Sequence, residues 1–336
     1  MKKRIISIFL CMFIIFAYTN ILTGCETVKK PLKIIFLGDS IAEGILGPSP
    51  ITERERYAYY GILGLRNNYE YNNRAVSGQQ SSDMLALIQK EDEGAAMTQT
   101  LIRDADVIHI SILGNDLLLT DIGQLILSAA DNDFSIIDEI LITSRIKFAA
   151  IVSTIREYNP DAVLMFQNVY NPVNEDSALI YDSIRQTLAG KDIEPDGYRE
   201  LGAALISRLN GVINDYLVEN PDAFYLIDSF SEFDRIYEID YDLGEKLIIA
   251  DGIHPSNYGH AVLADLIQKK LEVLSLADKN IAVKDYKTLR QEQLVRMFSE
   301  NVDTEKYITN INSASTCEEI TDIYFGAISG VLPDYY

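Results

Sequence analysis

Short apolar runs alternate with longer amphipathic stretches over residues 32–277, a pattern typical of an α/β domain with a parallel sheet. Five runs have the length and composition of strands: Leu32–Leu37, Tyr69–Val76, Val107–Leu113, Ala162–Val169 and Ala223–Asp228. Helical spacing predicts helices between them, including Tyr57–Leu65, Ile136–Tyr158, Tyr198–Leu217 and Asn257–Leu274. Ser256 is the expected N-cap of the last of these helices.

The pattern changes over residues 278–336, which we expect to form a small helical appendage. Apolar side chains recur there at helical spacing, at Tyr286, Leu289, Leu294 and Met297. Thr316 and Glu319 have the spacing of a capping box ahead of a further apolar stretch. We expect the appendage to pack on the main domain, with a lid or a partner-binding site as the alternatives.

The first 24 residues have the features of a signal peptide. Lys2–Arg4 form a positive n-region, and the apolar run Ile5–Tyr18 is shorter than the roughly 20 residues that span a bilayer. Leu22–Cys25 resembles a bacterial lipobox, in which the cysteine is acylated and becomes the first residue of the mature protein. We therefore predict a lipid-anchored protein outside the cytoplasm, with residues 25–31 as a tether. An uncleaved N-terminal anchor is the alternative.

Charge and composition narrow the function. The formal charge is −21, and removal of the three basic residues of the leader would bring it to −24. Such an acidic chain is a poor match for nucleic acid or anionic lipid head groups. The histidines are His109, His254 and His260, without a His-Glu-x-x-His pattern, so a catalytic metal is not indicated. After processing only Cys317 would remain besides the lipidated cysteine, which excludes an internal disulfide.

Ser40 is a candidate nucleophile. The apolar run before it continues directly into Gly38-Asp39-Ser40, which places the serine at the carboxyl end of the first predicted strand. Open α/β sheets build their sites at that edge. On its own this tripeptide is equally typical of an ordinary turn or helix cap.

Asp251 and His254 are candidates for the carboxylate and the base that a serine nucleophile needs. Histidine has a pKa suited to taking a proton near neutrality, and a carboxylate on its other ring nitrogen fixes the tautomer. Asp251 precedes His254 by three residues in a loop with Gly252 and Pro255, so one segment can supply both groups. A structural loop histidine is the alternative. His109 and His260 are weaker candidates, because they fall within a buried strand and a helix.

Gly78 and Asn115 follow two further predicted strands and are candidate oxyanion donors. Gly78 would offer a backbone N–H, Asn115 its side-chain amide, and Ser40 its own N–H. Each well-placed donor to a tetrahedral oxyanion is worth about 3 kcal/mol. Glycine and asparagine are also routine turn residues at such positions.

These segments, in this order, resemble the blocks of the SGNH hydrolases, the GDSL-like lipase and esterase family. The matching segments are Gly38–Gly44, Gly78, Asn115–Asp116 and Asp251–Pro255. The resemblance covers residues 32–277 and implies a three-layer α/β/α domain with a five-stranded parallel, flavodoxin-like sheet. It also implies a cofactor-independent reaction with the roles given above. One position departs from the family: the third block usually begins with glycine, and here Leu113 stands there.

The resemblance implies a serine esterase, and we expect its substrate to be a short acyl or acetylated glycan ester. The tether of about seven residues reaches at most ~25 Å, so we expect Ser40, at the far end of the first strand, to face away from the membrane. A lipid-active lysophospholipase or lipase is one alternative. The other is a non-catalytic surface lipoprotein that binds acylated glycans.

Overall fold

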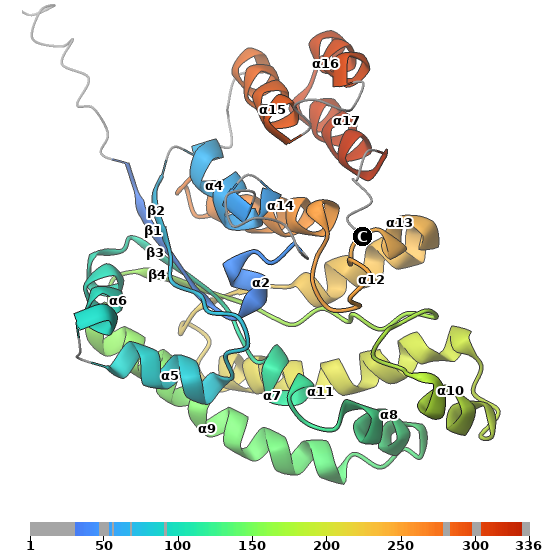
Figure 1. Ribbon diagram of the computed structural model, residues 1–336. Helices are drawn as coiled ribbons and strands as arrows, with labels where there is room; N and C mark the ends of the chain where they lie inside the picture. Colours follow the sequence, from blue (N-terminus) through green and yellow to red (C-terminus); the bar gives the residue numbers. More distant parts are fainter. Residues whose placement is uncertain are drawn as a thin grey trace, which may run out of the picture. The chain divides into compact units, whose positions relative to one another are not determined.

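A parallel β-sheet lies at the centre of the fold (Figure 1). The computed structural model describes residues 31–46, 54–55, 57–67, 69–90, 93–277, 283–297 and 304–330. Within these residues the sheet has five strands: β1 (Lys33–Gly38), β2 (Glu70–Asn73), β3 (Val107–Ser111), β4 (Val163–Gln167) and β5 (Tyr225–Ile227). All neighbouring strands are parallel, in the flavodoxin-like order β2-β1-β3-β4-β5. The predicted fold class is confirmed.

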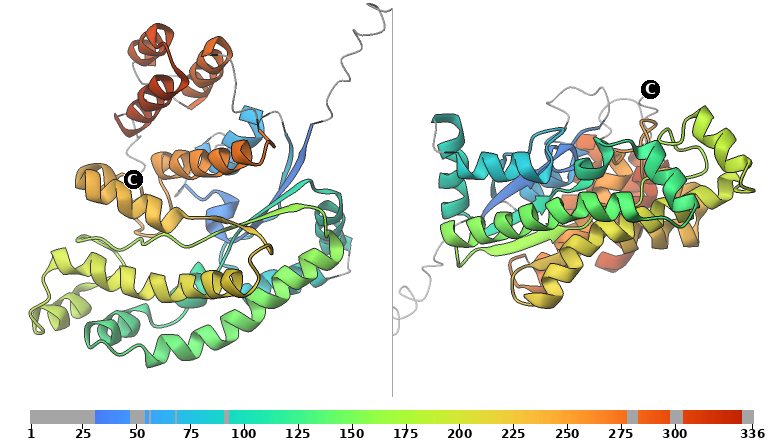
Figure 2. Two further views of the ribbon diagram at one scale, coloured as in Figure 1. Left: turned by 180° about the vertical axis from the view of Figure 1, so that it is seen from behind. Right: turned by 90° about the horizontal axis from the view of Figure 1, so that it is seen from below.

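Helices cover both faces of the sheet (Figures 1 and 2). One layer consists of α4 (Tyr59–Asn67), α12 (Ser229–Ile239) and α14 (Asn257–Val273). The other consists of α5 (Ser81–Gln89), α6 (Glu93–Asp104), α9 (Ser135–Tyr158) and α11 (Tyr198–Glu219). Ile34 and Phe36 of β1 belong to the core under the first layer, and Ile35 and Leu37 to the core under the second. Burial on both faces explains why the strands are continuous apolar runs.

Several short helices follow strand ends or connect the longer helices. They are α2 (Ser40–Glu43), α7 (Gly114–Leu118), α8 (Ile122–Ala130), α10 (Asp182–Ala189), the 3₁₀ turn η1 (Pro195–Gly197) and α13 (Tyr241–Glu245). The two shortest at strand ends, α2 and α7, begin just after β1 and β3 and carry candidate site residues. The predicted cap of α14 is confirmed, since Ser256 Oγ accepts a hydrogen bond from Gly259 N at 3.1 Å.

Four strands end earlier than the sequence pattern predicts, including β4, which ends at Gln167 instead of Val169, and β5, which ends at Ile227 instead of Asp228. The second was expected to reach Val76 but ends at Asn73, whose side-chain oxygen accepts a hydrogen bond from Ala75 N at 3.0 Å and turns the chain. The third was expected to reach Leu113 but ends at Ser111, because Leu113 adopts a φ of +95° that no strand contains.

The appendage contains three described helices: α15 (Val283–Met297), α16 (Thr304–Ser313) and α17 (Cys317–Gly330). The predicted capping box is present, with Glu319 N donating to Thr316 Oγ1 at 3.1 Å and Thr316 N donating to the Glu319 carboxylate at 3.3 Å. The α16 helix was not anticipated from the sequence. From Leu32 onward the chain forms one compact unit, and Tyr324 and Ile320 of α17 share a core with β1 and α14.

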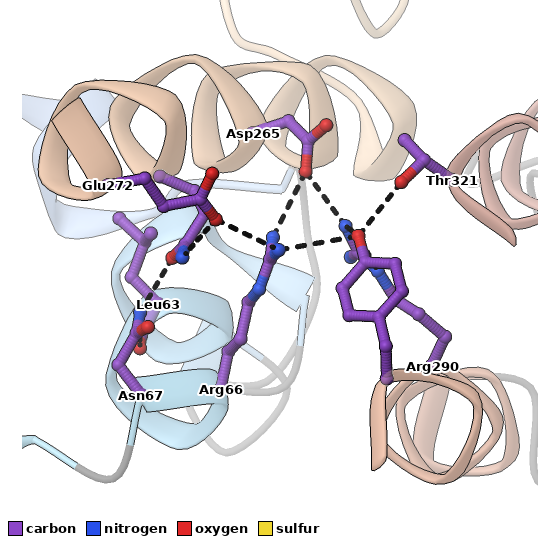
Figure 3. A network of polar contacts seen from close by, with 9 residues as sticks. Leu63, Arg66, Asn67, Asp265, Glu272, Arg290 and Thr321 are labelled. Atoms are coloured by element: carbon purple, nitrogen blue, oxygen red, sulfur yellow. Dashed lines mark hydrogen bonds and ion pairs between the residues drawn. The ribbon is translucent and has the colours of Figure 1, made fainter. Parts of the chain in front are cut away.

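An ion network joins the appendage to the α/β domain (Figure 3). Arg290 of α15 is 1% exposed and donates to Asp265 of α14 at 2.8 Å. Arg66 of α4 donates to the same carboxylate oxygen at 3.2 Å and contacts Glu272 at 3.7 Å. Tyr286 of α15 accepts hydrogen bonds from both guanidinium groups. Buried charges persist only when they are paired in this way, so the network fixes the docking of α15.

The predicted signal peptide, the tether up to residue 30 and Cys25 lie outside the described residues. Among the helices that the structure does describe, none is long and apolar enough to cross a membrane.

Candidate active site

Ser40 lies where β1 gives way to α2. The chain passes close to β3 at Gly38, where a Cβ would lie 1.8 Å from the carbonyl oxygen of Ser111, and φ there is +133°. Only glycine tolerates that approach and conformation. Asp39 then caps α2 by accepting a hydrogen bond from Ile41 N at 3.0 Å. Ser40 is therefore the first residue of α2, and among the described hydrogen bonds its N–H has no acceptor.

Asp251 and His254 are joined by a short hydrogen bond, 2.6 Å between the aspartate carboxylate and His254 Nδ1. The other carboxylate oxygen accepts the N–H groups of Ile253 and His254, each at 2.9 Å. Burial opposes the charge of Asp251, but these hydrogen bonds outweigh it and hold the pKa of the carboxyl below its ordinary value. A carboxylate on Nδ1 favours the tautomer that leaves Nε2 free as a base.

No hydrogen bond joins Ser40 Oγ to His254 within the part of the chain that the structure describes. The two segments nevertheless border the same pocket, because Ile253, the neighbour of His254, lines it together with Ser40. Tyr170 also lines this pocket and donates its hydroxyl to the Ile253 carbonyl at 2.6 Å. Catalytic hydrogen bonds are often long in unliganded enzymes. The predicted serine–histidine contact therefore stays a prediction.

The candidate oxyanion donors are near one another. Gly78 has a φ of +80° in an exposed turn, and within the described residues its N–H has no acceptor. Asn115 lies in the first turn of α7 and is 8% exposed. Its side-chain N–H donates to the carbonyl of Gln79, the residue after Gly78, at 3.0 Å. This bond fixes the amide orientation and leaves its second N–H available for a substrate oxygen.

Leu113 occupies the position where the family has glycine, and its backbone keeps the conformation of glycine. Its φ of +95° lies in the left-handed region that bulky residues rarely adopt. The side chain is fully buried and belongs to the core cluster that also contains residues of α5 and α9. Among the described residues it is not part of the pocket lining. The sequence left open a shifted turn or an altered pocket wall. Leu113 does not form the wall of this pocket, and its effect on the turn stays a prediction.

An apolar pocket is lined by Ser40 and by residues of α8 and α11. Its polar lining residues include Asp39, Ser40, Ser111, Asn115, Gln167 and Asn168. Its walls are mainly aliphatic: Ile112, Leu117, Leu118, Ile122, Ile126, Val169, Val173, Leu179, Leu205 and Ile206. Such a lining is suited to an aliphatic acyl group whose carbonyl carbon lies at Ser40.

Asp39 and Glu43 were not singled out from the sequence. Asp39 is 4% exposed, and burial raises the pKa of its carboxyl to about 7 despite the hydrogen bond from Ile41 and the nearby His254. Glu43 binds the turn that carries Gly78. The available signal was the position of both residues within the Gly38–Gly44 block, where a buried turn follows a strand.

His109 and His260 are packed in the interior, as expected. His109 lies in β3 and His260 in α14, both without exposed surface. Burial lowers the pKa of each imidazole to about 3. Both rings are therefore neutral near pH 7 and have no access to substrate.

Comparison with known proteins agrees with this arrangement. The profile of the GDSL-like Lipase/Acylhydrolase family matches residues 36–262. The uncharacterised protein YpmR of Bacillus subtilis (strain 168) is 27% identical over 224 residues, covering 60% of this chain and 81% of YpmR. The crystal structure of phospholipase A1 from Streptomyces albidoflavus NA297 superposes with a TM-score of 0.50 at 16% identity, covering 71% of this chain and 99% of that one.

A further solved structure, the lipase Lip_vut3 from a goat rumen metagenome, aligns with a TM-score of 0.49 at 21% identity, covering 71% of this chain and 96% of that one. At 16% identity, the similarity to the phospholipase structure supports the fold and not a shared activity. The family profile indicates an ester hydrolase, and the sheet order is consistent with it. Since the profile spans more than half of the sequence, the protein belongs to the GDSL-like lipase/acylhydrolase family.

Proposed function

We propose that this enzyme hydrolyses carboxylic esters through an acyl-enzyme on Ser40. With His254 taking its proton, Ser40 Oγ attacks the ester carbonyl carbon, and the oxyanion receives hydrogen bonds from the N–H groups of Ser40 and Gly78 and from Asn115. His254 then gives the proton to the leaving alcohol. Water, deprotonated by the same imidazole, attacks the acyl group, which releases the acid and restores the serine hydroxyl.

The observation that carries this proposal is the Asp251–His254 hydrogen bond on a loop that borders the Ser40 pocket. An imidazole held by a carboxylate on Nδ1 is prepared to act as a base through Nε2. Ser40 and Gly78 add N–H groups without acceptors among the described residues, which are the donors that an oxyanion requires.

The pocket lining bears on the substrate. A wall of aliphatic side chains favours an acyl group of several carbons, because each buried methylene contributes about 0.8 kcal/mol to binding. An acetyl group would leave most of this wall unused. We therefore propose short to medium aliphatic acyl esters, with acetylated glycans as weaker substrates than the sequence suggested. A lysophospholipase activity would use the same pocket for a longer chain.

Location and partners follow from the N-terminal sequence. We propose that lipid on Cys25 anchors the enzyme to the cell membrane and that it acts on small-molecule or glycan esters outside the cytoplasm. The acidic chain, with a formal charge of −21, supports neither nucleic acid nor an anionic lipid surface as a partner.

An ester panel tests the proposed function. Nitrophenyl esters from acetyl to long-chain acyl groups, acetylated oligosaccharides and a lysophospholipid are assayed with the wild-type protein and with Ser40→Ala. The proposal expects a maximum of kcat/KM at an intermediate chain length, and no hydrolysis by Ser40→Ala above the buffer rate. A fluorescent organophosphonate should label the wild-type protein and not the variant. Absence of both labelling and hydrolysis would favour the non-catalytic binding protein instead.

A further inference from the structure

The carboxylate of Glu43 attaches the turn that carries Gly78 to the helix of the nucleophile. Glu43, the last residue of α2, lies three residues after Ser40. Its Oε2 accepts the backbone N–H of Ser77 at 2.6 Å and also the Ser77 hydroxyl. Its Oε1 forms an ion pair with Arg54. Both carboxylate oxygens are thus occupied, and the residue just before Gly78 is held on two atoms.

A second attachment lies on the other side of Gly78. The carbonyl of Gln79 accepts the Asn115 side-chain N–H at 3.0 Å, and Gln80 donates its amide to the Asn115 carbonyl at 3.4 Å. Asp116 accepts the Ser81 N–H at 2.9 Å. The turn is therefore tied to α7 after Gly78 and to α2 before it.

Gly78 itself has nothing that would fix it by packing. It is exposed, and no atom lies within 4 Å of the position of an added Cβ. A glycine with a φ of +80° can also reach many other backbone conformations. Gln79 N donates to the Val76 carbonyl at 3.2 Å and closes the turn, and Val76 N donates to the Gly38 carbonyl at 2.9 Å. The direction of the Gly78 N–H depends on these bonds and on the side-chain bonds to Ser77 and Gln79, and an oxyanion donor is effective only when it is held in position before the reaction.

The charge of Glu43 is suited to this task. Burial opposes ionisation, but hydrogen bonds from the Ser77 hydroxyl and N–H, together with Arg54, hold the pKa of the carboxyl below its ordinary value. The carboxylate therefore stays charged near neutral pH. Arg54 balances that charge, which limits its repulsion of an oxyanion formed nearby.

We infer that Glu43 is a positioning residue: its carboxylate holds Ser77 so that the Gly78 N–H points at the oxyanion that forms next to Ser40. This inference rests on the proposed function, because it requires Gly78 to be an oxyanion donor. It explains why the block that carries the nucleophile also contains a carboxylate, since Ser40 and the turn of Gly78 are set relative to each other through α2.

The inference is tested with Glu43→Gln, Ser77→Ala and Ser77→Thr in the full chain, assayed on the best ester of the panel. Glu43→Gln keeps the shape but loses the charge, and we expect kcat to fall about 10-fold, less than the 10²–10³-fold that follows complete removal of a donor. KM should stay within about twofold, since the affected bond forms mainly in the transition state. Ser77→Ala should lower kcat less than Glu43→Gln does. Ser77→Thr keeps both bonds to Glu43, so its kcat should equal that of the wild type.

The matched control is Glu232→Gln, which breaks the ion pair with Arg235 on α12 and should leave kcat unchanged. The inference is overturned if Glu43→Gln has the kcat of the wild type. It is also overturned if the fraction of kcat lost equals the fraction of Glu43→Gln that a thermal melt shows to be unfolded at the assay temperature. If Glu43→Gln does not fold, Ser77→Ala against Ser77→Thr decides alone, and equal kcat in the two variants overturns the inference. Hydrolysis by Ser40→Ala at the wild-type rate would instead overturn the proposed function.

Discussion

The side-chain amide of Asn115 donates to the carbonyl oxygen of Gln79 at 3.0 Å, which links the turn after β3 to the turn after β2. One N–H of the amide is committed to this bond and the other is available. In the proposed mechanism the same side chain has two tasks, holding the turn of Gly78 and donating to the substrate oxyanion.

Replacement of Asn115 by alanine removes both the bond to Gln79 and the proposed oxyanion donor. We expect Asn115→Ala to lower kcat by about 10²–10³ with little change in KM, because the lost donor acts mainly in the transition state. Steady-state kinetics on one ester measure both constants. Asn159→Ala is the control, since Asn159 is also buried and also donates to backbone carbonyls, at Ile102 and Ala105. It should lower the melting temperature and leave kcat per folded molecule unchanged. A wild-type kcat in Asn115→Ala would contradict the assignment.

Leu113 provides a test of backbone strain. Both Leu113→Ala and Leu113→Gly should destabilise the protein, because truncation of a buried leucine to alanine costs about 2–5 kcal/mol. Glycine adopts a φ of +95° without strain and alanine does not, so Leu113→Gly should be the more stable of the two by about 1 kcal/mol. Denaturant unfolding measures the difference.

Leu209 is the control for this comparison. It is fully buried in α11, where Leu209→Gly should be less stable than Leu209→Ala by about 1 kcal/mol. Because Leu113 does not line the described pocket, Leu113→Gly should keep the wild-type ranking of acyl chain lengths. If the glycine variant were less stable than the alanine variant at both positions, the left-handed conformation of Leu113 would not be strained.

Asp39 should make stability depend on pH. Burial raises the pKa of this carboxyl from an ordinary value of 3.8 to about 7. The folded protein therefore holds a proton that the unfolded chain has lost, and the free energy of unfolding decreases as the pH rises through that interval. Asn is an equally good N-cap but does not titrate. The melting temperature of Asp39→Asn minus that of the wild type should increase from pH 4 to pH 7 and then level off. A difference that is constant with pH would contradict the raised pKa.

Arg290 should contribute strongly to stability. Removal of one partner from a buried ion network costs about 3–5 kcal/mol, so Arg290→Met should lower the free energy of unfolding by that order. Arg145→Met is the matched control, since Arg145 pairs with Asp215 on the surface, where ion pairs contribute about 0–1 kcal/mol. Equal effects of the two substitutions would mean that the appendage is bound by its apolar core alone.

The proposed lipid anchor depends on Cys25. Cys25→Ser should release the protein from membranes or leave an unprocessed precursor, because no other residue of the lipobox can accept the acyl chains. Membrane fractionation and the mass of the mature N-terminus measure this. Processing and detergent extraction identical to the wild type would exclude the lipoprotein assignment.

The sequence predicted the structure best where the residues that determine a feature lie within one short segment. The strands could be predicted because both of their faces are buried, which leaves apolar runs such as Ile34–Leu37. Ser40, Gly78 and Asn115 could be placed together because each follows a strand of one parallel sheet. Asp251 and His254 form their hydrogen bond within a single loop.

Contacts between distant segments could not be predicted in this way. The bond from Ser77 to Glu43 joins polar residues 34 positions apart, and neither residue departs from what a surface position tolerates. From the sequence Arg290 would be predicted as a solvent-exposed residue of an amphipathic helix, but in the structure it is 1% exposed. Burial of polar groups depends on which elements meet, and hydrophobic spacing within one element does not contain that information.

The long sequence separations of the ion network constrain how the chain folds as it is made. Arg66 donates to Asp265, 199 residues later, and to Tyr286, 220 residues later. During synthesis the guanidinium of Arg66 has no buried partner until almost the entire chain has left the ribosome. The α/β domain therefore cannot acquire its final α4–α14 contact before α14 is made. A nascent chain that ends before α15 holds Asp265 without Arg290 and Arg66 without the Tyr286 hydroxyl. We expect such truncated chains to depend on chaperones and to be removed by proteases faster than the complete protein.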